Sequence, residues 1–562
     1  MDSSRPTVAE LVAERWGDHR AGMWFEGRTV SQHRVAAGAA ARAALLADLL
    51  PQGAPPHLGV LLDNVPEYPM WLGAAALARA AVAGINPTRR GPELARDILH
   101  TECRILVTEP AHLPLLDGLD LPGVRLLVTG TDTYTELLAP YTGARPDGSR
   151  AAPSDRLLLC FTSGSTGAPK ATIVTQGRLA AAGHALAEHF AVRRDDVHYI
   201  CMPMFHGNAV IADWAPALAA GAATALRRRF SASGFLPDVR ASGATYFTYV
   251  GRAVQYVLAT PARPDDHDNP LRTGFGTEAG PVDAAAFERR FGVRLVEGYG
   301  SSEGGAAVRR TPGTPPGAVG RAAPGDDLAV VDPATGEECP AAVFDTDGRL
   351  LNGGDAIGEL VNRGTCAFEG YWRNPEAEAA RRRPGRAGTG GDWYWTGDLF
   401  YRDADGFLFF AGRTEDRLRV DSENLAAAAI EHILARYRGA AAVAVYAVPD
   451  PVAGDQVMAA LAPPDGAAPF DPLAFAEFLL AQPDLGTKMA PRFVRIVDRM
   501  PVTATNKIHR VELRRAGFRC PGPVWWRPPG ESAYRPLREQ DTRALLAQYR
   551  AHGRAELLDG YG

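Results

Sequence analysis

Lysine is nearly absent from this chain of 562 residues. Only three of its 60 lysine and arginine residues are lysine, at positions 170, 488 and 507. A general bias toward arginine explains the scarcity but not the places where lysine remains. Lys170 and Lys507 each close a loop-like stretch marked by glycine or threonine. Because lysine carries a compact point charge rather than a planar fork, these positions indicate phosphate or acyl-phosphate chemistry.

Other absences exclude several classes of protein. The six cysteines include no Cys-x-x-Cys pair, which argues against a disulfide framework or a zinc site. Residues 1–20 have no apolar signal core. The most apolar stretch, residues 71–85, is interrupted by Arg79 and is too short to span a bilayer. A net charge of −5 gives no reason to expect nucleic acid as a partner. We expect a cytoplasmic enzyme without a transmembrane segment.

The alternation of apolar patterns predicts a layered α/β protein. The chain is too long for a single ordinary core, so two or more domains are expected. Helix-like patterns at 35–50, 67–83 and 178–190 alternate with short β-rich runs, which is typical of α/β folds. The β-rich runs lie at 104–108, 125–129, 157–161, 171–176 and 197–203.

The pattern changes after about residue 355. Residues 393–401 and 407–411 flank an Asp-Gly turn, which predicts a β-hairpin. A smaller α/β unit is expected beyond a boundary near 413–416. Its expected elements are helix 424–437, strand 441–448, helix 472–482 and strand 492–498, followed by a tail that becomes helical.

A loop rich in glycine and hydroxyl groups follows the expected strand at 157–161. It reads Phe-Thr-Ser-Gly-Ser-Thr-Gly-Ala-Pro-Lys over residues 161–170. The N–H and O–H groups of such a loop can surround phosphate oxygens. A surface linker would not be flanked by apolar strands. A Walker loop would need Gly before the lysine and Ser or Thr after it, whereas this chain has Pro169 and Ala171. The loop therefore predicts another kind of phosphate site.

This loop closely resembles the phosphate loop of the adenylate-forming superfamily, which includes acyl-CoA synthetases, nonribosomal-peptide adenylation domains and luciferases. Further resemblances follow in order along the chain. Residues 299–303, Tyr-Gly-Ser-Ser-Glu, resemble the family's Tyr-Gly-x-Thr-Glu, and residues 396–398 match its Thr-Gly-Asp. Gly412-Arg413 leads into its hinge, and Lys507 falls on its C-terminal catalytic lysine.

The resemblance implies a fold, a branch and a division into domains. Three segments are similar to the fatty-acid-transport-protein and very-long-chain acyl-CoA synthetase branch, at 249–258, 268–272 and 525–537. The implied fold is a large N-terminal domain of layered sheets and helices with a small mobile α/β domain. The expected parts are an ATP- and substrate-binding domain at 1–412, a hinge at 413–416 around Glu415, a mobile domain at 417–518 and an extension at 519–562.

The implied chemistry is attack of a carboxylate on ATP, which gives an acyl adenylate and pyrophosphate. Glu303 is an oxygen ligand suited to Mg²⁺, Tyr299 offers an aromatic face to adenine, and Lys507 would bridge the carboxylate and the α-phosphate. Lys507, Glu303 and Lys170 are the expected catalytic residues. The other residues expected to hold ATP are Thr162, Ser163, Gly164, Ser165, Thr166, Gly167, Thr277, Glu278, Tyr299, Ser302, Asp398 and Arg413.

Taken singly, some of these residues have simpler interpretations. Asp398 alone could be a turn residue and Tyr299 a core aromatic residue, but the ordered set of motifs argues against both. Lys488 matches no motif and is expected on the surface. A substrate pocket is expected around His206, Asn208, Trp214, Tyr249, Val250 and Gly276. The polar residues His206, Asn208 and Asp213 favour a small or aromatic acid.

The acceptor in the second half-reaction is less well defined by the sequence. Where the family commonly has a glycine that lets the pantetheine arm of CoA pass, this chain has Ser422, which adds a side chain. CoA is the default acceptor. One alternative is an ATP-dependent diazotase that adenylates nitrite and transfers it to an aromatic amine, and another is an enzyme that feeds a separate carrier protein. A degenerate nucleotide-binding regulator is disfavoured because the four motif residues Lys170, Glu303, Asp398 and Lys507 are present.

Overall fold

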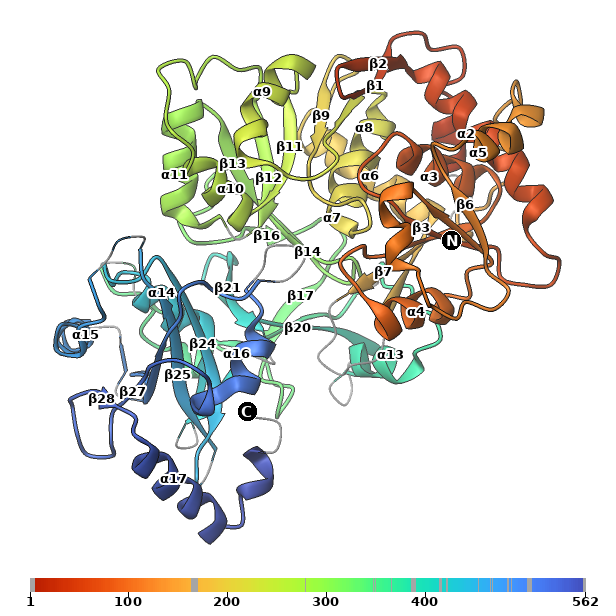
Figure 1. Ribbon diagram of the computed structural model, residues 1–562. Helices are drawn as coiled ribbons and strands as arrows, with labels where there is room; N and C mark the ends of the chain where they lie inside the picture. The colour runs from red at the N-terminus through yellow and green to blue at the C-terminus, as the bar shows by residue number, and fades with distance from the viewer. Residues whose placement is uncertain are drawn as a thin grey trace. The chain divides into compact units, whose positions relative to one another are not determined.

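The chain forms two compact units in the computed structural model (Figure 1). The first contains Met1–Arg310 and Cys366–Ala380, and the second contains Thr311–Thr365 and Arg381–Gly562. Part of the expected N-terminal domain, beyond residue 310, therefore groups with the second unit. The structure describes residues 6–162, 170–277, 279–346, 348, 350–364, 366–385, 391–413, 417–420, 423–452, 454–464, 466, 468–482, 485–486, 488–502 and 508–558.

Two largely parallel sheets form the framework of the first unit, as expected for an α/β fold. The six-stranded sheet has the order β6-β5-β3-β4-β7-β8, in which only β8 runs antiparallel to its neighbour. The seven-stranded sheet has the order β13-β12-β11-β9-β10-β1-β2, in which only β2 is antiparallel. The strands are β1 (Ala21–Phe25), β2 (Arg28–Ser31), β3 (His57–Leu61), β4 (Ala81–Gly84), β5 (Ile105–Thr108), β6 (Arg125–Val128), β7 (Arg156–Thr162), β8 (Lys170–Thr175), β9 (Val197–Ile200), β10 (Ala223–Leu226), β11 (Tyr246–Val250), β12 (Thr273–Thr277) and β13 (Arg294–Glu297), with a hairpin of β14 (Tyr299–Gly300) and β15 (Ala307–Arg309).

Small residues let the helices of this unit pack closely. A Cβ on Gly73 would come within 2.9 Å of the Cβ of Ala39, so the helices α2 and α3 are in contact through glycine and alanine. The first helix begins with a capping box between Thr7 and Glu10. The helices are α1 (Val8–Ala13), α2 (Gln32–Leu49), α3 (Glu67–Leu77), α4 (Gly91–His100), α5 (Asp132–Leu138), α6 (Gln176–His189), α7 (Gly207–Ala209), α8 (Ala215–Ala220), α9 (Ala232–Ser242), α10 (Gly251–Leu258), α11 (Gly280–Phe291) and α13 (Pro375–Arg381).

The helix expected at 67–83 is wrong at its C-terminal end. The pattern at 67–83 predicts a single helix, but the structure ends α3 at Leu77 and forms β4 at Ala81–Gly84. Arg79 between them has a φ of 56°, a left-handed conformation that breaks the helix. All four residues of β4 are buried between β3 and β7. Burial in the middle of a sheet therefore outweighs the helix propensity of alanine.

Within the described residues, the second unit contains two five-stranded sheets and a short hairpin. The expected hairpin at 393–411 is present as β20 and β21. The tail beyond residue 519, expected as a separate extension, adds β27 and β28 to the sheet β24-β25-β26-β27-β28. The elements are β16 (Arg321–Ala322), β17 (Leu328–Val331), α12 (Gly353–Ala356), β18 (Gly358–Asn362), β19 (Arg382–Pro384), β20 (Asp392–Arg402), β21 (Leu408–Arg413), β22 (Arg417–Val420), β23 (Glu423–Ala426), α14 (Ala427–Leu434), β24 (Ala442–Pro449), β25 (Asp455–Ala462), α15 (Pro472–Leu480), β26 (Phe493–Ile496), α16 (Arg510–Ala516), β27 (Val524–Trp526), β28 (Arg535–Pro536) and α17 (Glu539–Ala551).

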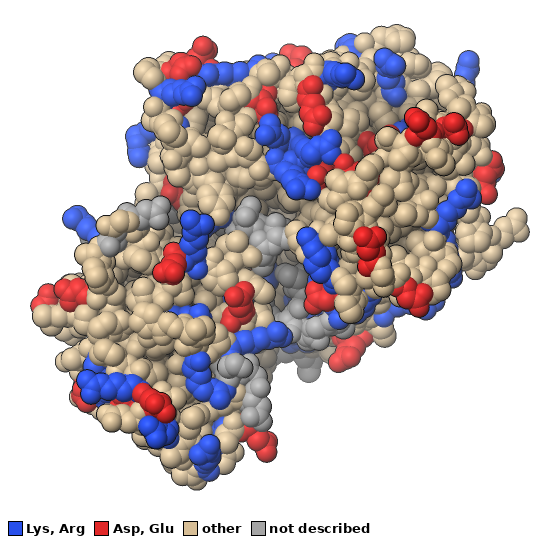
Figure 2. Space-filling view, in the orientation of Figure 1, with Lys and Arg blue, Asp and Glu red and all other residues tan. Residues whose placement is uncertain are grey.

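The surface carries charges of both signs, and the cysteines form no disulfide among the described residues. Lys and Arg side chains are interspersed with Asp and Glu side chains over the face shown in Figure 2. All six cysteines lie among the described residues and are unpaired. Burial raises the pKa of the Cys103 thiol to about 12 and that of Cys160 to about 12, which disfavours the thiolate form of both at neutral pH. Among the helices that the structure describes, none is long and apolar enough to cross a membrane.

Candidate functional site

The predicted phosphate loop joins β7 to β8. Backbone pairing places Thr162 directly opposite Lys170 at the end of this hairpin. Lys170 is the first residue of β8 and is partly buried. The side chain of Thr162 and all of residues 163–169 lie outside the described part of the chain. The phosphate contacts expected of Ser163, Gly164, Ser165, Thr166 and Gly167 therefore stay predictions.

Glu303, the predicted magnesium ligand, is a buried carboxylate with one oxygen held in place. Glu303 comes shortly after β14 in the chain, and only 6% of the residue is exposed. The hydroxyl of Tyr371 donates a hydrogen bond of 3.0 Å to Oε1. Its Oε2 makes no hydrogen bond with the described residues. Because Mg²⁺ prefers oxygen ligands and is usually bound through one or two carboxylates, this arrangement fits the expected ion.

The segment that carries Glu303 is held from two sides. Arg178 on α6 donates a hydrogen bond to the carbonyl oxygen of Ser302. A Cβ on Gly207 would come within 2.4 Å of the Ser302 hydroxyl oxygen, so the start of α7 packs directly against this serine. The structure thus brings the predicted nucleotide segment beside the predicted pocket residues His206 and Asn208, which flank that glycine.

Neighbouring strand ends carry four further predicted residues. In the register of β11 and β12, Tyr249 pairs with Gly276 and Val250 pairs with Thr277. The backbone just before Tyr299 donates a hydrogen bond of 3.2 Å to the Gly276 carbonyl, which places the predicted adenine contact at the same edge. A Cβ on Gly276 would lie 2.2 Å from the Tyr249 carbonyl oxygen, so only glycine fits there. Ligands of open α/β sheets bind at the carboxyl ends of the strands, which supports these assignments.

A π-helical turn at Val210–Trp214 carries the remaining pocket residue, Trp214, which is 5% exposed. Such turns are rare and are frequent at functional sites. The expectation that Asp213 makes the pocket polar is wrong. Asp213 is fully buried, its Oδ2 accepts a 2.9 Å hydrogen bond from Thr248, and its Oδ1 lies 3.0 Å from Nδ1 of His198. Burial raises the pKa of this carboxyl, and its oxygens are engaged inside the protein rather than contributing polarity to the predicted pocket.

Asp398, the predicted ribose ligand, lies at a turn in the second unit. Gly397 has a φ of 73°, which glycine adopts without strain. The Asp398 N–H donates a 3.1 Å hydrogen bond to the Thr396 hydroxyl. Arg413 lies opposite Asp398 in the strand pairing, with Nε 3.8 Å from Oδ1. The turn therefore presents a carboxylate beside a cation, as the resemblance implies for a ribose site.

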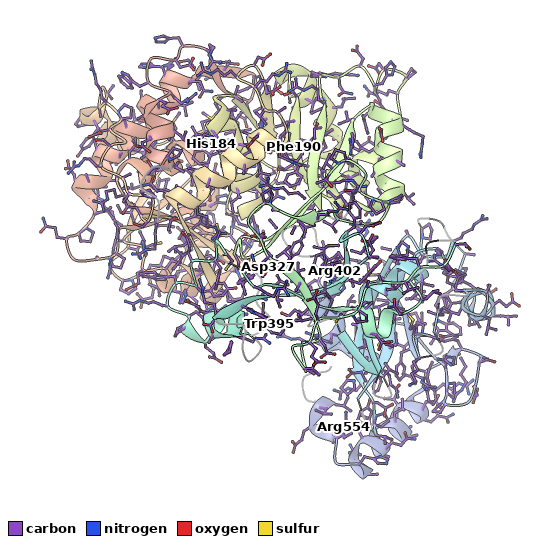
Figure 3. The ribbon with its side chains drawn as sticks, turned by 180° about the vertical axis from the view of Figure 1, so that it is seen from behind. His184, Phe190, Asp327, Trp395, Arg402 and Arg554 are labelled. Atoms are coloured by element: carbon purple, nitrogen blue, oxygen red, sulfur yellow. The ribbon has the colours of Figure 1, made fainter. Side chains whose placement is uncertain are left out.

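A buried glutamate that was not expected from the sequence shapes this turn. Glu359 on β18 is 1% exposed, and its Oε1 accepts a 2.8 Å hydrogen bond from the N–H of Gly397. Burial raises the pKa of Glu359, while that hydrogen bond and two nearby arginines act to lower it. One of these, Arg383, lies with its guanidinium 4.7 Å from the ring centre of Trp395, which Figure 3 labels on β20. No local pattern marks Glu359, because its partner is far away in sequence.

Several predicted residues cannot be placed. Glu278, Glu415, Ser422 and Lys507 lie outside the described residues. The ATP contact, the hinge, the acceptor channel and the catalytic lysine assigned to them therefore stay predictions. Lys488, expected on the surface, lies among the described residues and is partly buried.

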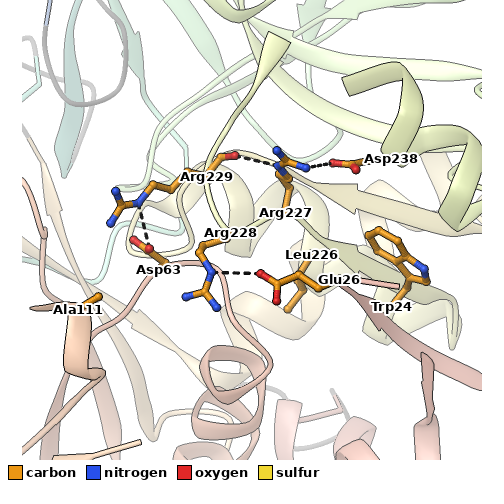
Figure 4. Close-up of a pocket in the computed structure, with 9 residues that line it drawn as sticks. All are labelled: Trp24, Glu26, Asp63, Ala111, Leu226, Arg227, Arg228, Arg229 and Asp238. Atoms are coloured by element: carbon orange, nitrogen blue, oxygen red, sulfur yellow. Dashed lines mark hydrogen bonds and ion pairs between the residues drawn. The ribbon is translucent and has the colours of Figure 1, made fainter. Parts of the chain in front are cut away.

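A cavity of about 610 Å³ in the first unit is lined by three consecutive arginines, which Figure 4 shows in close-up. Each guanidinium is already paired with carboxylates of the chain. The ion pairs are Arg227 with Asp238 at 2.8 Å, Arg228 with Glu109 at 2.7 Å and with Glu26 at 3.3 Å, and Arg229 with Asp63 at 3.0 Å. The carboxylates in these ion pairs outnumber the three arginines, so the cavity is not suited to bind an anion.

The same cavity borders a cluster of potential metal ligands. Ligand atoms of Asp63, Glu109 and His112 lie within 4.8 Å of one another. Burial acts to raise the pKa of Asp63, but hydrogen bonds from His112 and Arg229 lower it overall. Since arginines already compensate both carboxylates, the cluster is an internal ion-pair network between the strand ends of the first unit.

Comparison with known proteins identifies the family. The model of the family described as AMP-binding enzyme matches residues 9–372, and the model of the AMP-binding enzyme C-terminal domain matches residues 429–507. A steroid-22-oyl-CoA synthetase of Rhodococcus jostii (strain RHA1) is 48% identical over 99% of this chain and 100% of the relative. A medium/long-chain-fatty-acid–CoA ligase, FadD17, of Mycobacterium tuberculosis is 43% identical over 93% of this chain and 99% of the relative.

Solved structures share the fold. The anthranilate CoA ligase AuaEII in complex with anthranoyl-AMP superposes with a TM-score of 0.77 at 20% identity, over 92% of this chain and 98% of that one. ATP-bound MatB from Rhodopseudomonas palustris gives a TM-score of 0.77 at 22% identity, over 90% of this chain and 98% of that one. The expected fold class, a large N-terminal domain with a smaller C-terminal α/β domain, is confirmed.

Proposed function

This chain belongs to the AMP-binding enzyme family and is an AMP-forming acid–CoA ligase, and we propose that its acid is large and apolar. The observation that carries the proposal is the identity of 48% with a steroid-22-oyl-CoA synthetase over nearly the whole chain. The pocket residues are consistent with it, since Asp213 is buried in its own hydrogen bonds and Trp214, Tyr249 and Val250 are mainly apolar. The small or aromatic acid suggested by the sequence is the alternative.

In the first half-reaction, a carboxylate oxygen of the acid attacks the α-phosphorus of ATP, and the bond to pyrophosphate breaks. The negative charge that spreads over the phosphates requires positioned cations and donors. Lys170 and the loop before it hold the phosphates. Glu303 would hold Mg²⁺, which would supply positive charge to the phosphate oxygens. Lys507 bridges the carboxylate and the α-phosphate, while Asp398 accepts hydrogen bonds from the ribose.

In the second half-reaction, the thiol sulfur of CoA attacks the acyl carbonyl, the thiol proton passes to solvent, and the bond between the acyl carbon and the phosphate oxygen breaks to release AMP. The relatives that carry the proposal are named as CoA synthetases and ligases. Nothing in the comparisons supports the diazotase alternative or an aromatic amine as acceptor. CoA is therefore the proposed acceptor, although the chain has Ser422 where the family commonly has glycine.

The decisive test of the proposed function is AMP release with a panel of acids. With ATP, Mg²⁺ and CoA we expect the highest kcat/KM for acids with a steroid or a medium- to long-chain alkyl group, and lower values for benzoate and anthranilate. AMP release should depend on CoA, because the adenylate is consumed slowly without an acceptor. Turnover with nitrite and an aromatic amine but not with CoA would overturn the proposal. A preference for small aromatic acids would refute only the assignment of the acid.

The Ser422→Gly variant tests whether the serine narrows the path of CoA. We expect kcat/KM for CoA to rise by up to about tenfold, which corresponds to relief of about 1.4 kcal/mol. ATP–pyrophosphate exchange measured without CoA should be unchanged, because adenylation does not use this path. If CoA turnover does not improve, the serine is no obstacle and the argument from the missing glycine fails.

A further inference from the structure

A segment at 368–373, here called the strap, lies along the strand that begins with Lys170. The strap pairs with β8 in the antiparallel sense, with Tyr371 opposite Thr172. Backbone hydrogen bonds of 3.1 and 2.8 Å join Gly370 and Trp372 to the same strand. The strap therefore extends the six-stranded sheet next to the predicted phosphate loop, although it lies about 200 residues later in the sequence.

Side chains fix the strap at both ends. Glu369 accepts hydrogen bonds of 2.8 Å from the N–H and 2.6 Å from the hydroxyl of Thr175, where β8 gives way to α6. The carbonyl oxygen of Trp372 lies 3.0 Å from Nε2 of His100. The Arg156 guanidinium stacks over the Trp372 ring, 4.8 Å from the ring centre. The strap is thus held by many contacts that do not involve the Tyr371 hydroxyl.

The Tyr371 hydroxyl donates a hydrogen bond to the predicted magnesium ligand. Tyr371 is 4% exposed, and its O–H donates the 3.0 Å hydrogen bond to Oε1 of Glu303. The ring of Phe368 packs edge-on against the Tyr371 ring at 5.2 Å, which limits rotation of the phenol. A hydrogen bond to a carboxylate is stronger than one between neutral groups, and a buried carboxylate without partners is costly.

We propose that Tyr371 is a positioning residue for the metal site: it holds Oε1 of Glu303 so that Oε2 is presented to the divalent cation that ATP brings. This inference rests on the proposed role of Glu303 in the ligase reaction. Groups that orient metal ligands in this way affect metal affinity strongly, and their loss costs about 10–100-fold. The local sequence Gly-Tyr-Trp at 370–372 does not predict this role, because the carboxylate that Tyr371 contacts lies elsewhere in the chain.

The test uses Tyr371→Phe, which removes one hydroxyl and keeps the ring. With Mn²⁺ as the probe ion, binding to the enzyme–ATP complex is measured by electron paramagnetic resonance. We expect Mn²⁺ affinity to fall by about 10–100-fold. ATP binding in EDTA, measured by calorimetry, should be unchanged, since the hydroxyl acts through the cation site. Equal loss of ATP binding with and without the cation would show a merely structural role and overturn the inference.

A matched control is available in the same unit. The Tyr134 hydroxyl donates a 2.7 Å hydrogen bond to Oε2 of the partly buried Glu67. Tyr134→Phe removes the same kind of hydrogen bond away from the strap. This variant should bind Mn²⁺ and ATP as the unchanged protein does. A loss of Mn²⁺ affinity equal to that of Tyr371→Phe would mean that general destabilisation, and not positioning, explains the effect.

A double variant separates the possible failures. In a Glu303→Gln background, Tyr371→Phe should cause no further loss of Mn²⁺ affinity, because no carboxylate remains to be positioned. A further loss would overturn the inference, and so would unchanged Mn²⁺ binding in Tyr371→Phe alone.

If the unchanged protein releases AMP with acid and CoA while Tyr371→Phe binds Mn²⁺ normally, only the positioning role fails. If the unchanged protein does not bind Mn²⁺ and ATP, the proposed function fails with it.

Discussion

Replacing Lys507 by alanine is expected to lower adenylate formation by roughly 10²–10³-fold, the scale for removing one group that stabilises charge in a transition state. The side chain is proposed to bridge the attacking carboxylate and the α-phosphate, so its contribution appears mainly as the bond to phosphorus forms. Acid-dependent ATP–pyrophosphate exchange measures this step directly. Binding of ATP alone should change little, because the other phosphate contacts remain.

The scarcity of lysine supplies a clean control for this prediction. Lys488→Ala removes the same charge from the same part of the chain but from a position that matches no family motif. It should leave pyrophosphate exchange within about twofold, as expected for substitutions away from functional features. Lys507→Arg should remain impaired, because a planar fork does not reproduce a compact ammonium. Near-normal exchange in Lys507→Ala would remove this lysine from the mechanism.

Replacing Glu303 by glutamine should lower pyrophosphate exchange by at least about 100-fold, because a metal ion contributes several kcal/mol to such a transition state. Glutamine keeps the size of the side chain and can still accept the Tyr371 hydrogen bond, so the fold should persist. The loss should be accompanied by a higher Mg²⁺ concentration for half-maximal rate. An unchanged Mg²⁺ dependence would contradict the assignment.

Glu67→Gln provides the corresponding control. Glu67 also accepts a hydrogen bond from a tyrosine and also lies in the first unit, where it forms an ion pair with Arg42. Its replacement should affect the unfolding midpoint without changing the dependence of the rate on Mg²⁺. The contrast between the two glutamine variants separates a role in metal binding from a role in stability.

The local motifs were predictable because each of them is contiguous in the sequence. A buried strand, a glycine- and hydroxyl-rich loop and a return strand predicted the β7–β8 hairpin, and the Asp-Gly turn predicted that of β20 and β21. The family and the fold class follow from five such motifs in order, and comparison with known proteins confirms both. The roles assigned to single residues stay proposals.

Two expectations that the structure contradicts concern residues whose state depends on contacts between distant segments. The polarity of Asp213 suggested a polar pocket, yet the tertiary structure pairs this residue of the π-helical turn with His198 on β9 and Thr248 on β11. The alanine-rich run at 67–83 predicted one helix, yet burial between two strands makes its end a strand. Propensity and composition describe a residue in isolation, while burial and pairing decide its state.

Short motifs in a fixed order are enough to predict that this chain makes an adenylate, and they predict Lys170 and Lys507 as the cations suited to that task. How one of the key carboxylates is held depends instead on tertiary contacts. Glu303 and Tyr371 are 68 positions apart, and the antiparallel pairing of the strap with β8 brings them to 3.0 Å. A hydrogen bond of this kind depends on backbone pairing that no local pattern specifies.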